Sequence, residues 1–351
     1  MKVHRTVPVA LLCATLFAAI LAGAESDTEG QPLLMEEFRV PSSDAGIEIY
    51  VRSKRPAGLA AFGPQNIVLF VHGATYPAET TFDLRLDGIS WMDYVAQRGY
   101  EVYLVDLRGY GKSTRPPEMS EPPERNGPIV RTQTAVKDVA SAVNFILRRR
   151  HVPKINLIGW SWGCAIMARY TTENNERVSK LILHAPQWLR GPQPTIADKL
   201  GAYRAQDREQ GKERWISGIP MERRAEILPA RWLEQWAEAT WATDQIGAKQ
   251  SPPVLRAPNG VIQDSREFWE SGKPLYDASQ IRVPTFLVVG KWDVITPPSM
   301  LHGCFAALTN TPAKRFAEIE DGTHHVMMEK NRMRLFEAVQ QFLDERLPAT
   351  P

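Results

Sequence analysis

Residues 155–170 read INLIGWSWGCAIMARY. The apolar run INLIG predicts a buried strand and CAIMARY predicts a helix, so GWSWG must form a sharp turn between them. In so tight a turn the neighbouring backbone segments leave no room for a β-carbon two residues before or after the serine, which explains Gly159 and Gly163. The turn would hold Ser161 at the N-terminus of a helix, beside free N–H groups. This G-x-S-x-G pattern in a strand–turn–helix context favours a nucleophilic serine over a tight turn with an incidental one.

The rest of the chain repeats this alternation of short apolar runs and helical patterns. Strands are expected over 47–51, 66–71, 100–106, 155–159, 180–184, 283–290 and 315–319. Helices are expected over 91–98, 134–149, 162–172, 298–308 and 327–346. Continuous apolar strands that alternate with helices are typical of an α/β protein with a mostly parallel central sheet flanked by helices.

One long segment, residues 186–280, breaks the alternation. It contains helical patterns without a convincing buried strand, and it holds six of the ten tryptophans. We interpret it as a helical cap inserted over the sheet. The chain then divides into a leader (1–24), the first part of an α/β core (25–185), the cap (186–280) and the second part of the core (281–351). Residues 115–128 carry five prolines and are expected to form a surface loop, with a flap over a site as the alternative.

A nucleophilic serine needs a base, and the base needs an acid that orients it. His324 and His325 follow the strand expected at 315–319, and Asp293 follows the preceding apolar run. Open α/β sheets place catalytic groups at the carboxyl ends of their strands. One histidine of this pair is the candidate base and Asp293 the candidate acid, in the chain order Ser161, Asp293, His.

Five motifs together resemble the α/β-hydrolase family with a cap domain, over nearly the whole chain after the leader. They are LFVHGAT at 69–75, DLRGYGKS at 106–113, GWSWG at 159–163, GKWDVITPP at 290–298 and EIEDGTHHVMMEK at 318–330. The resemblance implies an α/β-hydrolase fold with a helical cap insertion, and an esterase- or lipase-like serine hydrolase.

The resemblance also implies roles for single residues. In the family the catalytic histidine lies five residues before a glutamate; with Glu329 as that glutamate, His324 is the base and His325 the alternative. The oxyanion hole would consist of the backbone N–H groups of Ala74 and Trp162. Structural roles are expected for His72, Asp106, Arg108 and Ser113.

Ser161 as nucleophile implies acyl transfer through a covalent acyl-enzyme and argues against relatives that use an aspartate at the turn, namely haloalkane dehalogenases and epoxide hydrolases. The expected reaction is hydrolysis of a carboxylic ester or lactone of an apolar or aromatic small molecule, with Trp160 and Trp188 as pocket residues. An acyltransferase or a perhydrolase would use the same residues. A non-catalytic binding protein on this scaffold is the alternative from another class. No metal or nucleotide motif is present in the sequence, so no cofactor is expected.

The composition is that of an ordinary globular protein. Apolar residues make up 43% and charged residues 23% of the chain, and a net charge of +2 gives no case for nucleic-acid binding. Residues 1–24 have the layout of a secretory signal peptide: a basic start, an uncharged apolar stretch and an A-x-A site. We therefore expect cleavage after Ala24 and export to the periplasm or medium, with no stable membrane association afterwards; an uncleaved anchor is the alternative. The sequence does not indicate an oligomeric state. Cys164 and Cys304 are expected to be separate buried thiols.

Overall fold

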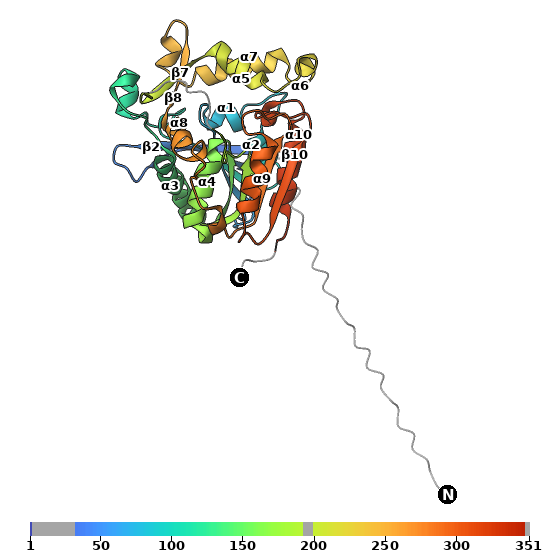
Figure 1. Ribbon diagram of the computed structural model, residues 1–351. Coiled ribbons are helices and arrows are strands. Elements are labelled where there is room, and N and C mark those ends of the chain that lie inside the picture. Colours follow the sequence, from blue (N-terminus) through green and yellow to red (C-terminus); the bar gives the residue numbers. More distant parts are fainter. Residues whose placement is uncertain (2–31, 192–198, 348–351) are drawn as a thin grey trace.

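An eight-stranded sheet forms the centre of the molecule (Figure 1). The computed structural model describes Met1 and residues 32–191 and 199–347, so the expected signal peptide lies outside the described residues. The strands follow the order β1-β2-β4-β3-β5-β6-β9-β10, and all neighbours are parallel except that β2 is antiparallel to β1 and β4. Their bounds are β1 Leu33–Pro41, β2 Glu48–Pro56, β3 Ile67–Val71, β4 Glu101–Asp106, β5 Ile155–Trp160, β6 Val178–His184, β9 Thr285–Gly290 and β10 Lys314–Ile319.

Helices cover both faces of this sheet, as the sequence predicted. The helices of the core are α1 Ala78–Phe82, α2 Trp91–Ala96, α3 Thr132–Arg150, α4 Trp162–Glu173, α9 Pro298–Ala307 and α10 Arg332–Asp344. Short 3₁₀ turns lie at Pro117–Ser120, Pro123–Arg125, Asn175–Arg177, Ala278–Gln280 and Val326–Met328. Strands β3, β4, β5 and β9 are buried along their whole length, which explains why their sequences are continuous apolar runs.

The inserted segment forms a layer across one end of the sheet (Figure 1). Its helices are α5 Arg208–Ile216, α6 Arg224–Ile227, α7 Ala230–Trp241 and α8 Gly260–Asp264, with one turn of π-helix at Ser265–Trp269 and 3₁₀ turns at Met221–Arg223 and Gly247–Lys249. The segment also contains two strands, β7 Tyr203–Asp207 and β8 Val254–Pro258, which pair antiparallel in a sheet of their own. The expectation of a segment without a convincing buried strand was therefore wrong, because β8 is buried over most of its length. The sequence of β7, YRAQD, is polar, and pairing with β8 rather than an apolar pattern makes it a strand.

Two further elements differ from the expectation. Strand β1 was not predicted, because its sequence LLMEEFRVP is partly exposed at the sheet edge and lacks a continuous apolar run. The last helix begins at Arg332 rather than near residue 327, because a 3₁₀ turn and a break at Glu329 precede it.

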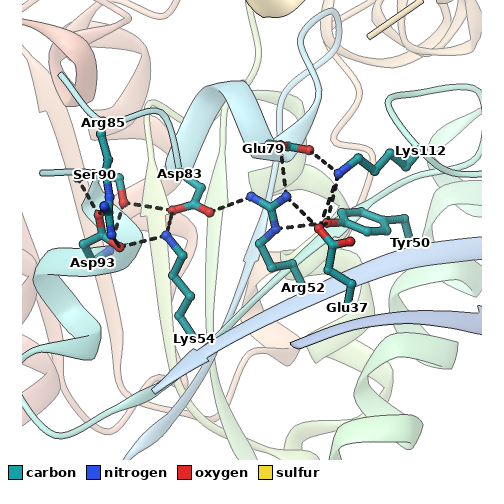
Figure 2. A network of polar contacts seen from close by, with 10 residues as sticks. All are labelled: Glu37, Tyr50, Arg52, Lys54, Glu79, Asp83, Arg85, Ser90, Asp93 and Lys112. Carbon is teal, nitrogen blue, oxygen red and sulfur yellow. Dashed lines mark hydrogen bonds and ion pairs between the residues drawn. The ribbon is translucent and has the colours of Figure 1, made fainter. Parts of the chain in front are cut away.

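A charged network fastens the sheet to its first two helices (Figure 2). Lys54 on β2 donates to Asp83 at 2.5 Å and to Asp93 on α2 at 2.8 Å, and Arg52 donates to the other oxygen of Asp83 at 2.7 Å. Glu37, Glu79, Arg85 and Lys112 extend the network, so that four cations meet four carboxylates. Because each buried charge has an oppositely charged partner, the desolvation cost of the group is offset within it.

Candidate active site

Ser161 lies at the turn between β5 and α4, in the strained backbone that the sequence predicted. Its φ and ψ are 54° and −120°, a conformation that a residue with a β-carbon rarely adopts. A β-carbon on Gly159 would lie 2.6 Å from the backbone of Gly163, and one on Gly163 would collide with the carbonyl oxygen of Val71. The two glycines are therefore required by the close approach of the backbone, and the turn presents Ser161 at the start of α4.

Asp293 and His324 are in direct contact, although 31 positions separate them in the chain. His324 Nδ1 lies 2.8 Å from Oδ2 of Asp293. The other carboxylate oxygen accepts the backbone N–H groups of Ile295 and Thr296, each at 2.8 Å, and the Thr296 hydroxyl donates to Oδ2 at 2.8 Å. Burial opposes ionisation of Asp293, but the charge of His324 and these hydrogen bonds outweigh it, so the pKa of Asp293 is lowered. A charged Asp293 orients the His324 ring through Nδ1 and leaves Nε2 available for a proton.

The loops that carry these residues meet at Trp160. Its indole N–H donates to the backbone carbonyl of His324 at 2.9 Å, and the rings of the two residues lie 5.3 Å apart. On the other side, a β-carbon on Gly73 would lie 3.1 Å from Cβ of Ser161 and 3.1 Å from the Trp160 ring. The structure therefore brings together the turn at Ser161, the histidine loop and the loop after β3, from which the candidate oxyanion donor Ala74 comes.

The loop after β3 is fixed by side-chain hydrogen bonds. His72 Nε2 accepts the backbone N–H of Leu107 at 3.1 Å, so Nδ1 carries the proton and donates to the carbonyl of Gly73 at 2.7 Å. Burial lowers the pKa of His72 to about 4, which keeps the ring neutral. The hydroxyl of Tyr110 donates to the carbonyl of Ala74 at 2.8 Å. His72 therefore has the structural role expected from the sequence.

The candidate oxyanion donors are two backbone N–H groups. In the part of the chain that the structure describes, neither the N–H of Ala74 nor that of Trp162 has a hydrogen-bond acceptor. For Trp162 this follows from its place as the first residue of α4, where helical N–H groups have no partner within the helix. Two such donors beside one serine are what a tetrahedral oxyanion requires.

The loop after β4 is held by its own polar groups. Asp106 accepts the backbone N–H groups of Ala78 at 2.8 Å and Lys112 at 3.0 Å. Arg108 pairs with Asp138 at 2.6 Å. The Ser113 hydroxyl donates to the carbonyl of Asp106 at 2.5 Å. These contacts are structural, as expected.

Glu329 closes the histidine loop. Its carboxylate accepts the hydroxyl of Thr323 and, at 3.2 Å, the backbone N–H of the same residue. Burial raises the pKa of Glu329 to about 7. The glutamate that sets the position of the histidine in the sequence motif therefore binds the residue directly before His324 and limits how far the loop can move.

His325 faces away from Asp293, into a cluster of aromatic rings. Its ring centroid lies 5.7 Å from Trp215, 6.2 Å from Tyr76 and 5.4 Å from Trp160. Among the described residues, its Nδ1 has no hydrogen-bond partner. Burial, together with the charge of His324, lowers the pKa of His325 well below its ordinary value. A neutral ring without an acid partner is poorly suited to the role of base.

Tryptophans of the inserted segment complete this aromatic cluster. Trp236 packs edge-on against Trp215 at 4.6 Å and against Tyr76 at 4.8 Å, and Trp241 packs against Trp236 at 5.7 Å. We define the aromatic cluster as Tyr76, Trp215, Trp236, Trp241 and His325. It connects Tyr76 of the oxyanion loop (the loop after β3) and His325 of the histidine loop with helices α5 and α7.

Trp162, which follows the serine, and Trp188, a predicted pocket residue, have different surroundings. Trp162 is fully buried, and its indole N–H donates to the hydroxyl of Thr132 on α3 at 2.8 Å. The ring of Trp188 lies 5.4 Å from Tyr276 and next to Gly303 on α9. Trp188 lines a cavity of about 330 Å³ with residues of the 274–278 segment. The contacts that the structure records for Trp188 therefore do not connect it with Ser161, and its place in a substrate pocket stays a prediction.

Sequence reasoning missed two supports of the site. Thr296 lies in the quoted acid motif three residues after Asp293, but nothing in its spacing indicated a bond to the carboxylate. Arg204 reaches the oxyanion loop from β7, and because that strand was not predicted, its position was not either.

Within residues 32–191 and 199–347, no group of three or more His, Cys, Asp and Glu side chains is placed to hold a metal ion. No helix in these ranges is long and apolar enough to span a bilayer. Cys164 and Cys304 are buried free thiols, as expected.

A model of the alpha/beta hydrolase fold family matches residues 66–331, which is more than half of the chain. The protein belongs to the α/β-hydrolase family. This membership confirms the resemblance and the fold class that the five motifs indicated. Together with esterase-like neighbours among solved structures, it supports a hydrolase.

Solved structures share the fold at low sequence identity. A thermophilic esterase from Thermogutta terrifontis is 17% identical, with a TM-score of 0.58 over 88% of this α/β-hydrolase and 98% of that chain. A serine hydrolase involved in carbazole degradation is 18% identical, with a TM-score of 0.59 over 89% of this chain and 100% of that chain. These similarities show the fold.

One curated relative also matches. The Abhydrolase domain-containing protein abhd-5.2 of Caenorhabditis elegans is 29% identical over 99 residues, which is 28% of this chain and 20% of that protein. The chain thus matches about a fifth of the length of this relative.

Proposed function

We propose that this α/β-hydrolase is a serine hydrolase that cleaves a carboxylic ester or lactone of an apolar or aromatic small molecule. The observation that carries the proposal is the 2.8 Å contact between His324 Nδ1 and Asp293, within the group of loops that packs around Ser161. A buried acid–histidine pair beside a serine on a strained strand-to-helix turn is the arrangement that nucleophilic catalysis requires.

In the first half of the proposed reaction, Ser161 Oγ attacks the carbonyl carbon of the ester and His324 Nε2 takes the hydroxyl proton. The carbonyl oxygen becomes negative and accepts the N–H groups of Ala74 and Trp162. Asp293 stabilises the imidazolium through Nδ1. His324 then gives its proton to the alkoxide oxygen, the carbon–oxygen bond breaks, and the alcohol leaves an acyl-enzyme.

In the second half, a water molecule takes the place of the alcohol. His324 removes a proton from the water, the resulting hydroxyl attacks the acyl carbon, and the oxyanion forms again on the same two N–H groups. The intermediate collapses, Ser161 Oγ regains the proton from His324, and the carboxylic acid leaves. Net consumption is one ester and one water, with no cofactor.

The aromatic cluster supports an apolar or aromatic substrate. Its rings are buried, and its member His325, which directly follows the proposed base, lies 5.4 Å from Trp160, which directly precedes the proposed nucleophile. Large rigid rings bind apolar ligands with little loss of conformational entropy. We accordingly propose that the acyl or alcohol group of the substrate packs against this cluster.

The central test uses Ser161→Ala and a fluorophosphonate probe. The wild-type protein should hydrolyse p-nitrophenyl esters and be labelled at Ser161, whereas the variant should lose both properties and keep its fold. Labelling at another residue, or full activity in the variant, contradicts the proposal. A panel of esters of graded chain length, lactones and amides then identifies the bond, and competing alcohols or peroxide distinguish hydrolysis from acyl transfer or perhydrolysis.

The two histidines provide an internal comparison. His324→Ala should reduce kcat about as much as the serine variant, while His325→Phe should keep most activity because that ring has no acid partner. If His325→Phe is the more severe change, the base is assigned to the wrong residue.

We also propose that the protein is exported after cleavage behind Ala24. This rests on the leader sequence, which lies outside the described residues. N-terminal sequencing of the protein recovered from the periplasm or medium should start at Glu25; a protein that retains the leader in a membrane fraction contradicts cleavage.

A further inference from the structure

Strand β7 of the inserted segment crosses the loop that carries Ala74. Alternate residues of a strand point to the same side, and Arg204 and Gln206 of β7 both contact this loop. Arg204 Nη2 donates to the carbonyl of Ala74 at 2.7 Å and to the hydroxyl of Thr75 at 2.8 Å. Gln206 Nε2 lies 3.4 Å from the hydroxyl of Tyr76. The inserted segment is thus bonded to three successive residues of the oxyanion loop.

The other end of the Arg204 guanidinium is fixed within the inserted segment. Nη1 donates to the carbonyl of Pro258 on β8 at 2.7 Å. Because β7 and β8 are paired and Pro258 packs on Gly109 of the core, the guanidinium is held between two rigid elements. Because the guanidinium is planar and held at both ends, it fixes the direction of the Ala74 carbonyl as well as the distance between that carbonyl oxygen and Nη2.

Among the described residues, the charge of Arg204 has no carboxylate partner. All its acceptors in the described parts of the chain are neutral oxygens, and no ion pair involves it. Two buried arginines are paired with carboxylates instead: Arg52 with Asp83 in the network of Figure 2, and Arg256 with Asp244 at 2.7 Å. Burial lowers the pKa of Arg204, and the charge of Arg214 acts in the same direction. An unpaired cation in a poorly solvated place is costly.

We propose that Arg204 is a positioning residue of the oxyanion hole, and that its unpaired cation favours the negative charge that develops on the substrate oxygen. The inference rests on the proposed function, because it assumes that Ala74 donates to an oxyanion. It explains why the cation is retained without an acid: a carboxylate at this place would cancel the field that stabilises the transition state.

The peptide geometry around Ala74 shows how Arg204 acts. The N–H of Ala74 lies between two peptide carbonyls, that of Gly73 and its own. His72 holds the first at 2.7 Å, and Arg204 and Tyr110 hold the second at 2.7 and 2.8 Å. With both carbonyls fixed, the N–H points in one direction before substrate binds, which is the condition for efficient oxyanion stabilisation.

The test compares Arg204→Met, Arg204→Gln and Arg204→Lys with the wild type on one neutral p-nitrophenyl ester and on one that carries a carboxylate. Removing one direct oxyanion donor typically costs about 10²–10³ in kcat. Because Arg204 acts through Ala74, we expect Arg204→Met to lower kcat by roughly 10- to 100-fold with KM changed by less than about threefold. Arg204→Lys, which keeps the positive charge, should lower kcat less than Arg204→Met does. Arg204→Gln, which keeps N–H donors but not the charge, should give a kcat between those of the other two variants.

A boronic acid that forms a tetrahedral adduct on Ser161 provides a second measurement, its inhibition constant, which a purely structural role of Arg204 would leave unchanged. Its inhibition constant should rise by the same factor by which kcat/KM falls.

Arg231→Gln is the matched control, because Arg231 lies on α7 of the same segment, is mostly exposed and pairs with Asp87 at the surface. In this control, kcat and the inhibition constant should equal those of the wild type. Thermal unfolding shows whether each variant folds. If Arg204→Met does not fold, the ratio of kcat in Arg204→Lys to kcat in Arg204→Gln tests the proposal, which expects this ratio to exceed one.

Three results overturn the proposal. They are an unchanged kcat in Arg204→Met, a loss confined to KM, and a loss confined to esters that carry a carboxylate, which would make Arg204 a substrate-recognition residue. A wild type that is neither active nor labelled at Ser161 overturns the proposed function and the inference together, whereas an active wild type with unaffected Arg204 variants overturns only the inference.

Discussion

The indole N–H of Trp160 donates a 2.9 Å hydrogen bond to the backbone carbonyl of His324. Trp160 directly precedes the proposed nucleophile, and His324 is the proposed base, so one bond connects the two loops whose relative position the chemistry depends on. The bond is buried, because Trp160 is 2% and His324 4% exposed. The residue before the serine thus acts on the site through the backbone of the histidine, independently of any contact with substrate.

Trp160→Phe tests this bond. The phenyl ring keeps most of the packing but leaves the His324 carbonyl without a donor, which typically costs about 1–3 kcal/mol. We expect a lower free energy of unfolding and a several-fold lower kcat with little change in KM. Chemical denaturation and steady-state kinetics measure both. Tyr100→Phe is the control, because it removes a hydrogen bond to Asp344 at 2.8 Å without touching the site; an equal loss of kcat in that variant would mean that stability alone is responsible.

Asp293→Asn should nearly abolish turnover. The amide keeps the shape of the side chain but cannot stabilise an imidazolium or hold His324 in the tautomer with a proton on Nδ1. In serine proteases the equivalent change costs about 10⁴ in kcat, and a loss of this order is expected here for ester hydrolysis. Asp321→Asn in the histidine loop is the control, since Asp321 is partly exposed at its surface. A variant at Asp293 within tenfold of the wild type would remove this residue from the mechanism.

Glu329 makes the stability of the fold dependent on pH. Its pKa is raised to about 7, whereas an unfolded glutamate titrates near 4.5. Between these values the unfolded chain loses the proton and the folded one keeps it, so rising pH destabilises the fold. The difference corresponds to on the order of 3 kcal/mol.

Glu329→Gln should remove this dependence, because the amide resembles the protonated acid. The unfolding free energy of the wild type, minus that of the variant, should fall as pH rises from about 4.5 to 7 and stay level above. Buried histidines titrate equally in both proteins and cancel. Denaturation curves at several pH values give this difference, and a difference that is flat throughout would show that Glu329 is ionised in the folded protein.

Local sterics made the central part of the fold predictable. Gly159, Gly163 and Ser161 lie within five residues, and the backbone clash that requires the glycines depends on this turn and the strand beside it. The buried parallel strands were predictable for a related reason: burial on both faces leaves only apolar residues, and the acid follows at the end of the buried strand β9. For these elements the sequence carries the constraint within a few residues.

Elements that depend on a distant partner were not predictable. Strand β7 is polar and exists because β8, about 50 positions away, pairs with it. Arg204 therefore had no assignable place, and its bond to Ala74 spans 130 positions. Thr296 and Trp160 illustrate the same limit, because their bonds are made by atoms whose geometry only the assembled loops define.

The last prediction concerns substrate choice and the aromatic cluster. Trp215 on α5 packs on Trp236 at 4.6 Å and on His325 at 5.7 Å, so it connects the inserted segment with the residue after the base. Trp215→Leu should change the ranking of aromatic against acetate esters, because loss of one ring contact in a pocket corresponds to about 1–3 kcal/mol, or roughly 10- to 200-fold in relative kcat/KM. Competition between p-nitrophenyl phenylacetate and p-nitrophenyl acetate measures the ratio directly. Trp269→Leu, at a buried tryptophan of the same segment outside the aromatic cluster, should leave that ratio unchanged. If Trp215→Leu remains folded and slows both esters by one common factor, the cluster holds the inserted segment in place without selecting the substrate.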